Sequence, residues 1–390
     1  MPHRLVLRDG RNPNAAAHRT LQRHSTQETF VSSTHTIDVD ALQRAMQLLV
    51  RGFGSDEAEV HAVCSNLIEA NLAGHDSHGI GMLPRYTDSY LEGSLKPNTH
   101  VRTVLDSGAM LRLDGQAGFG QVVGHEAMAL GIERAQQHGC CVMGLGNAHH
   151  LGRIGAWAEQ AAAAGLVSLH FVNVISRGIV APYGGADARF GTNPFTAAIP
   201  LKGREPMILD FATSVIAQGK TRVAHNKGET VPPDHLIDHE GRPTQDPRYS
   251  VIEPFGAILT FGAHKGYGMA VLCELLGGAL AAGMAQYTDD TSKKRVLNGM
   301  LTVLIDPAKI ADTAAYEREA LTFVDWVTAS PPRAGFDRVR LAGEPERESR
   351  ARRMKGGVPV DATTWLEILN AAQKLGVDPK RVSAEAGVSA

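Results

Sequence analysis

The sequence HDSH at residues 75–78 puts two histidines, an aspartate and a serine side by side after a helical segment that ends in glycine. Histidine titrates near neutral pH, so it can donate or accept a proton in catalysis, and it is also a common metal ligand. Alternatively, these polar groups only satisfy the open carbonyls of a helix end. Gly79 and Gly81 follow and allow a ligand to approach the backbone, so we favour a functional loop.

A second polar cluster is GLGNAHHLGRIGAW, which contains His149, His150 and Arg153. It follows a predicted strand and precedes a predicted helix, a position where α/β proteins place ligand groups. Adjacent side chains diverge in most backbone geometries, so we expect only one of the two histidines to face a given site. Arg153 faces the same way if the helix begins there. A histidine that caps a helix and a surface arginine are the alternative interpretation.

Three further polar positions lie next to predicted elements. Thr192, in the GTNP stretch before a strand, belongs either to a turn or to a substrate site. Asp210 ends an apolar strand and is either a helix N-cap or a group that receives hydroxyls or orients a histidine. Lys265 lies between glycines at the start of a helix, where it either binds an anion or is only solvated.

The common nucleotide motifs are absent: GLGN and GQAGFG both lack the third glycine of the Rossmann fingerprint, and there is no phosphate-binding P-loop. The histidines and Asp210 could supply metal ligands, but no tightly spaced motif such as HExxH occurs. We therefore expect no metal, and a metal-dependent hydrolase remains the alternative from another class.

The elements that carry these residues change in character along the chain. Residues 35–104 are predicted to be helical, including a helix at 56–74 with Ser55 as N-cap and Gly74 as C-cap. Residues 105–307 alternate short apolar strands with amphipathic helices, which predicts an α/β sheet layered with helices. Residues 308–390 are helical again. We predict a sheet domain and one helical domain formed by both chain ends.

Composition excludes several classes of protein. The formal net charge of -2 gives no reason to expect nucleic acid as a partner. The four cysteines form no disulfide or zinc pattern, which favours a reducing, cytoplasmic setting. No apolar run is long enough to span a membrane, and AVLCELLGGALAAG from Ala270 is predicted to be a buried helix. The arginine-rich residues 1–34 are predicted to be a disordered leader.

Taken in order, the motifs GHDSHG, HHLGRIG, GGADARFGTNP, LDFATS and HKGYG resemble the malate/L-lactate dehydrogenase family that is unrelated to Rossmann-type enzymes. The resemblance runs from about residue 36 to the end of the chain. It implies an oxidoreductase that uses NAD or NADP and acts on 2-hydroxy and 2-oxo carboxylates. It also implies a homodimer, with a mixed-sheet, non-Rossmann cofactor domain. A cyclic imine reductase on the same fold is the alternative enzyme.

The resemblance also assigns roles to individual positions. His150 matches the proton-transfer histidine, and His78 with Ser77 matches a pair that borders the substrate, with His78 as the alternative acid. The positions that match cofactor contacts are Asn173, Val174, Asp210, Phe211, Ala212, Lys265, Gly343 and Glu344.

One position departs from the family pattern. Many members have an arginine four residues after the second histidine of this loop, and Met82 stands there instead. Arginine pairs with a carboxylate through two parallel hydrogen bonds, which methionine cannot do. Either Arg85 or Arg153 takes over this role, or the pocket favours a larger apolar substrate such as an aromatic 2-oxo acid.

Overall fold

A seven-stranded mixed sheet forms the centre of the chain in the computed structural model, which describes residues 34–287 and 295–388. Only β3 and β4 pair in parallel; the other neighbours are antiparallel. The predicted mixed α/β fold is therefore confirmed, while the predicted leader lies outside the described residues apart from Thr34. The strand order is β2 (Arg102–Asp106), β3 (Met110–Asp114), β4 (Cys140–His149), β11 (Leu297–Ile305), β5 (Val167–Ile175), β6 (Phe195–Ile199) and β7 (Met207–Phe211).

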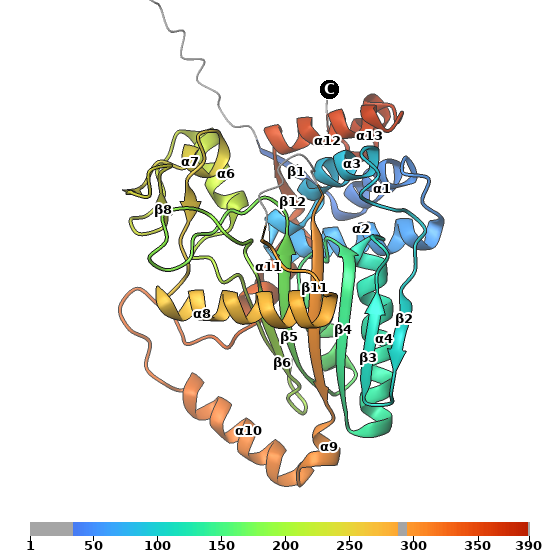
Figure 1. The fold of residues 1–390 in the computed structure, drawn as a ribbon, viewed down its shortest axis with the longest axis vertical. Coiled ribbons are helices and arrows are strands. Elements are labelled where there is room, and N and C mark those ends of the chain that lie inside the picture. Colours follow the sequence, from blue (N-terminus) through green and yellow to red (C-terminus); the bar gives the residue numbers. More distant parts are fainter. Residues whose placement is uncertain (1–33, 288–294, 389–390) are drawn as a thin grey trace, which may run out of the picture. The chain divides into compact units, whose positions relative to one another are not determined.

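Helices cover both faces of the sheet. In Figure 1, α8 (His264–Cys273) and the π-helix η3 (Glu274–Ala282) cross in front of β5, β11 and β4, and α4 (Gly120–His138) and α5 (Gly155–Ala163) pack on the other face. Glycines make the close approach of η3 possible: a Cβ atom on Gly146 of β4 would lie 2.8 Å from the Cα atom of Ala282.

The segment from Ala270 is helical, but the prediction that it is buried was wrong. Only the side with Gly277, Gly278 and Ala281 faces the sheet. The opposite side exposes large apolar residues to solvent: Leu272 is 47% exposed, Leu275 54% and Leu280 66%. A run of apolar residues does not show whether one face or both faces will be covered. None of the described helices is both long and apolar enough to cross a membrane.

The two ends of the chain meet in one helical region. Strands β1 (Thr34–Ile37) and β12 (Val358–Asp361) pair antiparallel, and helices from both ends share a hydrophobic core. The chain from residue 32 onward forms one compact unit, so the proposed domain boundaries remain predictions. The helices of this region are α1 (Val39–Arg51), α2 (Glu57–Leu72), α3 (Leu83–Leu91), α12 (Ala362–Lys374) and α13 (Pro379–Ala386).

Helix α10 (Thr313–Thr328), which follows α9 (Pro307–Ile310), lies away from this helical region (Figure 1). It is tied to the β6–β7 connection by the ion pairs Lys202–Glu317 at 2.7 Å and Arg204–Asp325 at 2.5 Å. None of its residues is buried. The shorter elements are η1 (Asp76–His78), η2 (Ile80–Met82), α6 (Gln218–Lys227), β8 (Leu236–Ile237), β9 (Pro243–Thr244), α7 (Arg248–Val251), β10 (Ala257–Ile258) and α11 (Glu344–Gly356).

Candidate active site

His78 and His150 line one cavity of about 380 Å³. Their rings are stacked with 5.6 Å between centroids and an angle of 18° between planes. His78 ends η1, just after helix α2, and His150 follows strand β4. The two polar clusters of the sequence therefore meet at the junction between the helical region and the sheet.

The turn that carries His78 is held tightly against α2. Both predicted caps of α2 are one residue off, because Asp56 rather than Ser55 caps its start and Ala73 rather than Gly74 is its C-cap. Gly74 follows the C-cap at φ +87° and lets the chain leave the helix. Asn71 then accepts a hydrogen bond from the Ile80 amide at 2.9 Å and donates one to Asp76 at 2.7 Å. A Cβ atom on Gly79 would lie 2.1 Å from the Asn71 amide oxygen, so glycine is required there.

Burial and one carboxylate act on His78 in opposite directions. Burial lowers the pKa of His78 to about 4, although the negative charge of Asp210 raises it. The Ser77 hydroxyl lies 3.0 Å from Nδ1 of His78, which leaves Nε2 as the ring atom that can meet a ligand. Asp210 itself accepts hydrogen bonds from the Gly155 amide and the Thr196 hydroxyl, both at 2.8 Å. It thus caps α5, which lies earlier in the sequence.

His150 has different surroundings. Its Nδ1 lies 2.7 Å from the Tyr86 hydroxyl, and burial holds the pKa of His150 well below its usual range, helped by the nearby charges of His78, His149 and Arg85. His149 points elsewhere and packs edge-on against Tyr86, with ring centroids 5.2 Å apart. Burial lowers the pKa of His149 to about 3. The expectation that only one of the adjacent histidines faces the site is confirmed.

The sequence model of the malate/L-lactate dehydrogenase family matches residues 37–369. The chain belongs to this family. It is 48% identical to hydroxycarboxylate dehydrogenase B of Escherichia coli strain K12 over 91% of this chain and 98% of that protein.

Solved structures of two other enzymes share the fold of this chain. The sulfolactate dehydrogenase of Methanocaldococcus jannaschii superposes with a TM-score of 0.78 at 28% identity, over 89% of this chain and 99% of that chain. The Δ1-piperideine-2-carboxylate reductase of Pseudomonas syringae pvar. tomato superposes with a TM-score of 0.75 at 29% identity, over 87% of this chain and 100% of that chain.

The structure places some of the residues predicted from the family resemblance on the cavity and others away from it. Arg153 forms an ion pair with Glu159 at 2.6 Å and does not line the cavity. Asn173 bonds to Glu274 at 3.1 Å and to the Gly299 amide at 2.8 Å, so it joins sheet and helix. Predicted residues that line the cavity are Ser77, His78, Met82, Arg85, His150, Val174, Thr192 and Ala212.

Five other predicted cofactor positions do not line this cavity, and one of them is Asp210, which bonds to the Gly155 amide and the Thr196 hydroxyl. Phe211 packs against the rings of Phe195 and Phe261, and Lys265 is exposed at the start of α8. Gly343 and Glu344 begin α11, next to strand β7.

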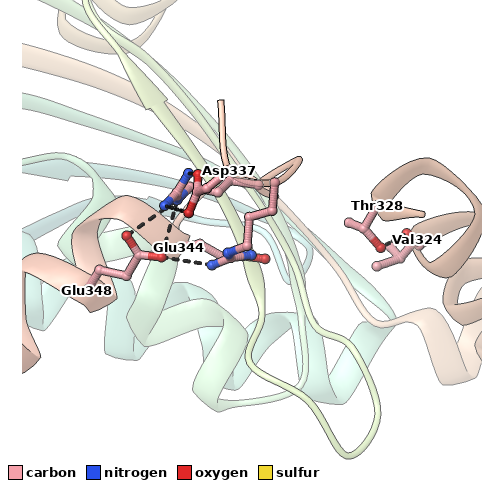
Figure 2. A network of polar contacts seen from close by, with 7 residues as sticks. Val324, Thr328, Asp337, Glu344 and Glu348 are labelled. Atoms are coloured by element: carbon pink, nitrogen blue, oxygen red, sulfur yellow. Dashed lines mark hydrogen bonds and ion pairs between the residues drawn. The ribbon is translucent and has the colours of Figure 1, made fainter. Parts of the chain in front are cut away.

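Ion pairs fix the segment before α11, as Figure 2 shows. Arg338 pairs with Glu344 and Glu348, and Arg340 pairs with Asp337 and Glu348. Glu344 lines a different cavity, which also contacts Val324 of α10. These contacts give Glu344 a structural role in holding the segment before α11.

Residues outside the recognised motifs complete the cavity wall. Helix α6 contributes Gln218, Gly219 and Arg222, and a Cβ atom on Gly219 would lie 2.9 Å from Cβ of Ser77, so α6 packs directly on the histidine turn. Asn298 of β11 also lines the cavity, and its side chain accepts from the Leu151 amide at 2.8 Å. A lone asparagine in an apolar strand was a usable signal for Asn298, whereas the sequence of α6 carries none.

A metal centre finds no support among residues 34–287 and 295–388, where no three histidine, cysteine, aspartate or glutamate side chains are grouped to hold an ion. His75 is directed to α11, where its Nε2 lies 3.2 Å from Glu346. The two histidines of the HDSH turn therefore have different neighbours: His75 contacts Glu346, and His78 stacks on His150.

Proposed function

We propose that this protein is an NAD(P)H-dependent oxidoreductase that interconverts 2-oxo and 2-hydroxy carboxylates in the cavity between His78 and His150. Family membership and the named relatives indicate an oxidoreductase that acts on 2-hydroxycarboxylates. The observation that carries the proposal is the stacked histidine pair in one cavity with Arg85, whose buried Nε has no hydrogen-bond partner in the described part of the chain. Such a set suits a carbonyl next to a carboxylate.

The cavity fits a nicotinamide ring beside a small acid. Its volume of about 380 Å³ lies in the range of small-molecule sites. Small or apolar side chains from strand ends, Val174 and Ala212, form a wall opposite the helical region, and Thr192 adds a hydroxyl. These three residues would hold the ring. When bound, the nicotinamide supplies the hydride for ketone reduction.

The surroundings of the two histidines favour His78 as the proton carrier, the alternative that the sequence left open. Asp210 stabilises the imidazolium form of His78, whereas His150 has no carboxylate among the groups that shift its pKa. His78 would donate a proton to the carbonyl oxygen during reduction and take it back during oxidation. His150 would hold the same oxygen by a hydrogen bond from Nε2.

We propose that Arg85 binds the substrate carboxylate. It lines the cavity, whereas Arg153, the other candidate, is already paired with Glu159. Met82 and several valines and isoleucines make the remaining lining largely apolar. A second cavity of about 820 Å³ shares Arg85 and Arg222 with the first. The second cavity is lined mainly by charged and polar residues, so it is the apolar lining of the first cavity that favours bulky or aromatic 2-oxo acids.

The decisive experiment measures NADH and NADPH oxidation by the purified protein with pyruvate, phenylpyruvate and Δ1-piperideine-2-carboxylate. We expect reduction of the 2-oxo acids, with a higher kcat/KM for phenylpyruvate than for pyruvate. Equal kcat/KM values for these two acids would contradict the bulky-substrate proposal. No oxidation of either cofactor with a broad panel of 2-oxo acids would refute the proposed function.

A cyclic imine reductase is the second candidate, because the chain shares its fold with Δ1-piperideine-2-carboxylate reductase at 29% identity. A ring C=N bond next to a carboxylate presents the same charges to the site as a 2-oxo acid. A kcat/KM for the imine above that of every 2-oxo acid tested would make this the preferred function.

We also propose that the enzyme is a homodimer in the cytoplasm. Two helices expose large apolar side chains: Leu275 and Leu280 on η3, and Phe323 (63% exposed) and Trp326 (74% exposed) on α10. Exposed apolar surface of this kind is typical of a protein–protein contact. All four cysteines are free, which suits a reducing compartment.

A further inference from the structure

A buried chain of hydrogen bonds links Gln121, Tyr86 and His150. Of these three residues, only His150 lines the cavity. The Gln121 amide nitrogen donates to the Tyr86 hydroxyl at 2.9 Å, and that hydroxyl lies 2.7 Å from Nδ1 of His150. Tyr86 is fully buried and Gln121 is 2% exposed. Both distances are those of well-formed hydrogen bonds.

The direction of this chain sets the tautomer of His150. A hydroxyl has one hydrogen to donate, and the Gln121 amide already donates to the Tyr86 oxygen. The Tyr86 hydrogen is therefore free to point at Nδ1 of His150, which accepts it. A neutral imidazole carries its proton on the other nitrogen, so Nε2 bears the hydrogen.

The Tyr86 ring is fixed on two sides. Phe119 and His149 both meet it edge-on, with ring centroids 6.0 Å and 5.2 Å away. Burial raises the pKa of Tyr86, so the hydroxyl keeps its proton at neutral pH. The Tyr86 hydroxyl is thus a protonated hydrogen-bond donor that is held in a fixed position beside Nδ1 of His150.

We propose that Tyr86, oriented by Gln121, is a positioning residue that locks His150 in the Nε2–H tautomer, so that His150 presents a hydrogen-bond donor to the substrate carbonyl oxygen. This inference rests on the proposed function for its role in catalysis, but the tautomer is a property of the enzyme without substrate. Tyr86 acts through His150 and does not touch the substrate itself. A neutral imidazole donor polarises a carbonyl without giving up its own proton.

The tautomer is tested by ring ¹⁵N NMR of histidine-labelled enzyme, with the His150 signals identified by their loss in His150→Gln. We expect wild-type His150 to carry its proton on Nε2 alone, and Tyr86→Phe to show both tautomers. A wild-type proton on Nδ1 would mean that the Gln121 amide is reversed and would overturn the proposal. An unchanged tautomer in Tyr86→Phe would overturn it as well.

Kinetics test the consequence for turnover. Tyr86→Phe keeps the packed ring and removes one hydrogen bond. We therefore expect kcat for 2-oxo acid reduction to fall about tenfold, which corresponds to an increase of roughly 1.4 kcal/mol in the activation free energy. KM for the nicotinamide cofactor should stay within about twofold, because the hydroxyl does not line the cavity. Unchanged kcat in Tyr86→Phe would refute the role in turnover.

Two comparisons exclude a general structural effect. Tyr90 lies on the same helix and packs against Phe53, so Tyr90→Phe makes the same chemical change away from His150 and should keep full activity. Gln121→Met should lower kcat in the wild type but not further in Tyr86→Phe, because the link to His150 is already broken. An equal loss in Tyr90→Phe, or additive losses for the double variant, would contradict the positioning role. If wild type reduces no 2-oxo acid, the proposed function fails while the NMR result still decides the tautomer.

Discussion

Replacement of Arg85 by methionine tests the proposed carboxylate grip directly. The Arg85 guanidinium lines the cavity, and its buried Nε has no partner in the described residues. Removal of the guanidinium therefore leaves no acceptor of the described residues without its donor. A hydrogen bond between charged groups contributes about 1.5–3 kcal/mol, so kcat/KM for a 2-oxo acid should fall about 10- to 150-fold in Arg85→Met.

The assay compares a 2-oxo acid with its primary amide, which has the same shape without the charge. Wild type should prefer the acid by about that factor, and Arg85→Met should lose the preference because only the charged group depends on the guanidinium. The matched control variant is Arg222→Met, because Arg222 also lines the cavity but forms an ion pair with Glu367 at 3.4 Å. It should keep the wild-type preference for the acid.

A rescue variant makes the test stricter. Met82 lines the same cavity, and the family resemblance predicts an arginine at its position. Met82→Arg in the Arg85→Met background should therefore recover part of the preference for the acid and favour pyruvate over phenylpyruvate. The reasoning is refuted if Arg85→Met keeps the acid-to-amide ratio of the wild type. It is equally refuted if Arg222→Met loses this ratio while Arg85→Met does not.

Three other changes follow from the site and surface. In Asp210→Asn the charge that raises the pKa of His78 is gone, so the limb on which reductive kcat falls with rising pH should move to lower pH; an unmoved limb in the pH profile would contradict this. Because burial lowers the pKa of His149 to about 3, His149 contributes about 2 kcal/mol to the stability lost between neutral pH and about pH 5; His149→Phe should remove this share in urea unfolding, while the other buried histidines keep theirs. Leu275→Asp should lower the mass measured by light scattering if η3 lies in the dimer contact.

The sequence predicted most individual elements but not their order in the sheet. Apolar runs bounded by glycine and proline matched β3–β7 and β11, because local composition determines whether a segment forms a strand. Strand β11, however, lies between β4 and β5 although more than a hundred residues separate it from β5. This pairing depends on contacts far apart in the chain, which no local pattern records.

Only part of the cavity lining was predictable from the sequence, and the geometry of the cavity was not. His78 and His150 were recognisable because polar residues rarely cluster at the ends of apolar segments without a role. Their stacking depends on where the turn after α2 lies relative to the end of β4, and Asn71 fixes this turn by its contact with Gly79. Tyr86 escaped notice for the same reason: a tyrosine in a helix has no sequence signal for what its hydroxyl meets.

If Arg85 binds the substrate carboxylate as proposed, Met82 and Arg85 together explain how a carboxylate-binding arginine can change position without a change of fold. The two positions are three residues apart, which is close to one helical turn, so their side chains lie on the same side of the chain. An arginine at position 85 instead of 82 shifts the positive charge by about 4.5 Å along the helix axis, at about 1.5 Å per residue. The space beside the histidines is then lined by methionine, which adapts to apolar groups of different shape. If Arg85 binds the carboxylate as proposed, a methionine at position 82 leaves room for a larger substrate while the site keeps its positive charge.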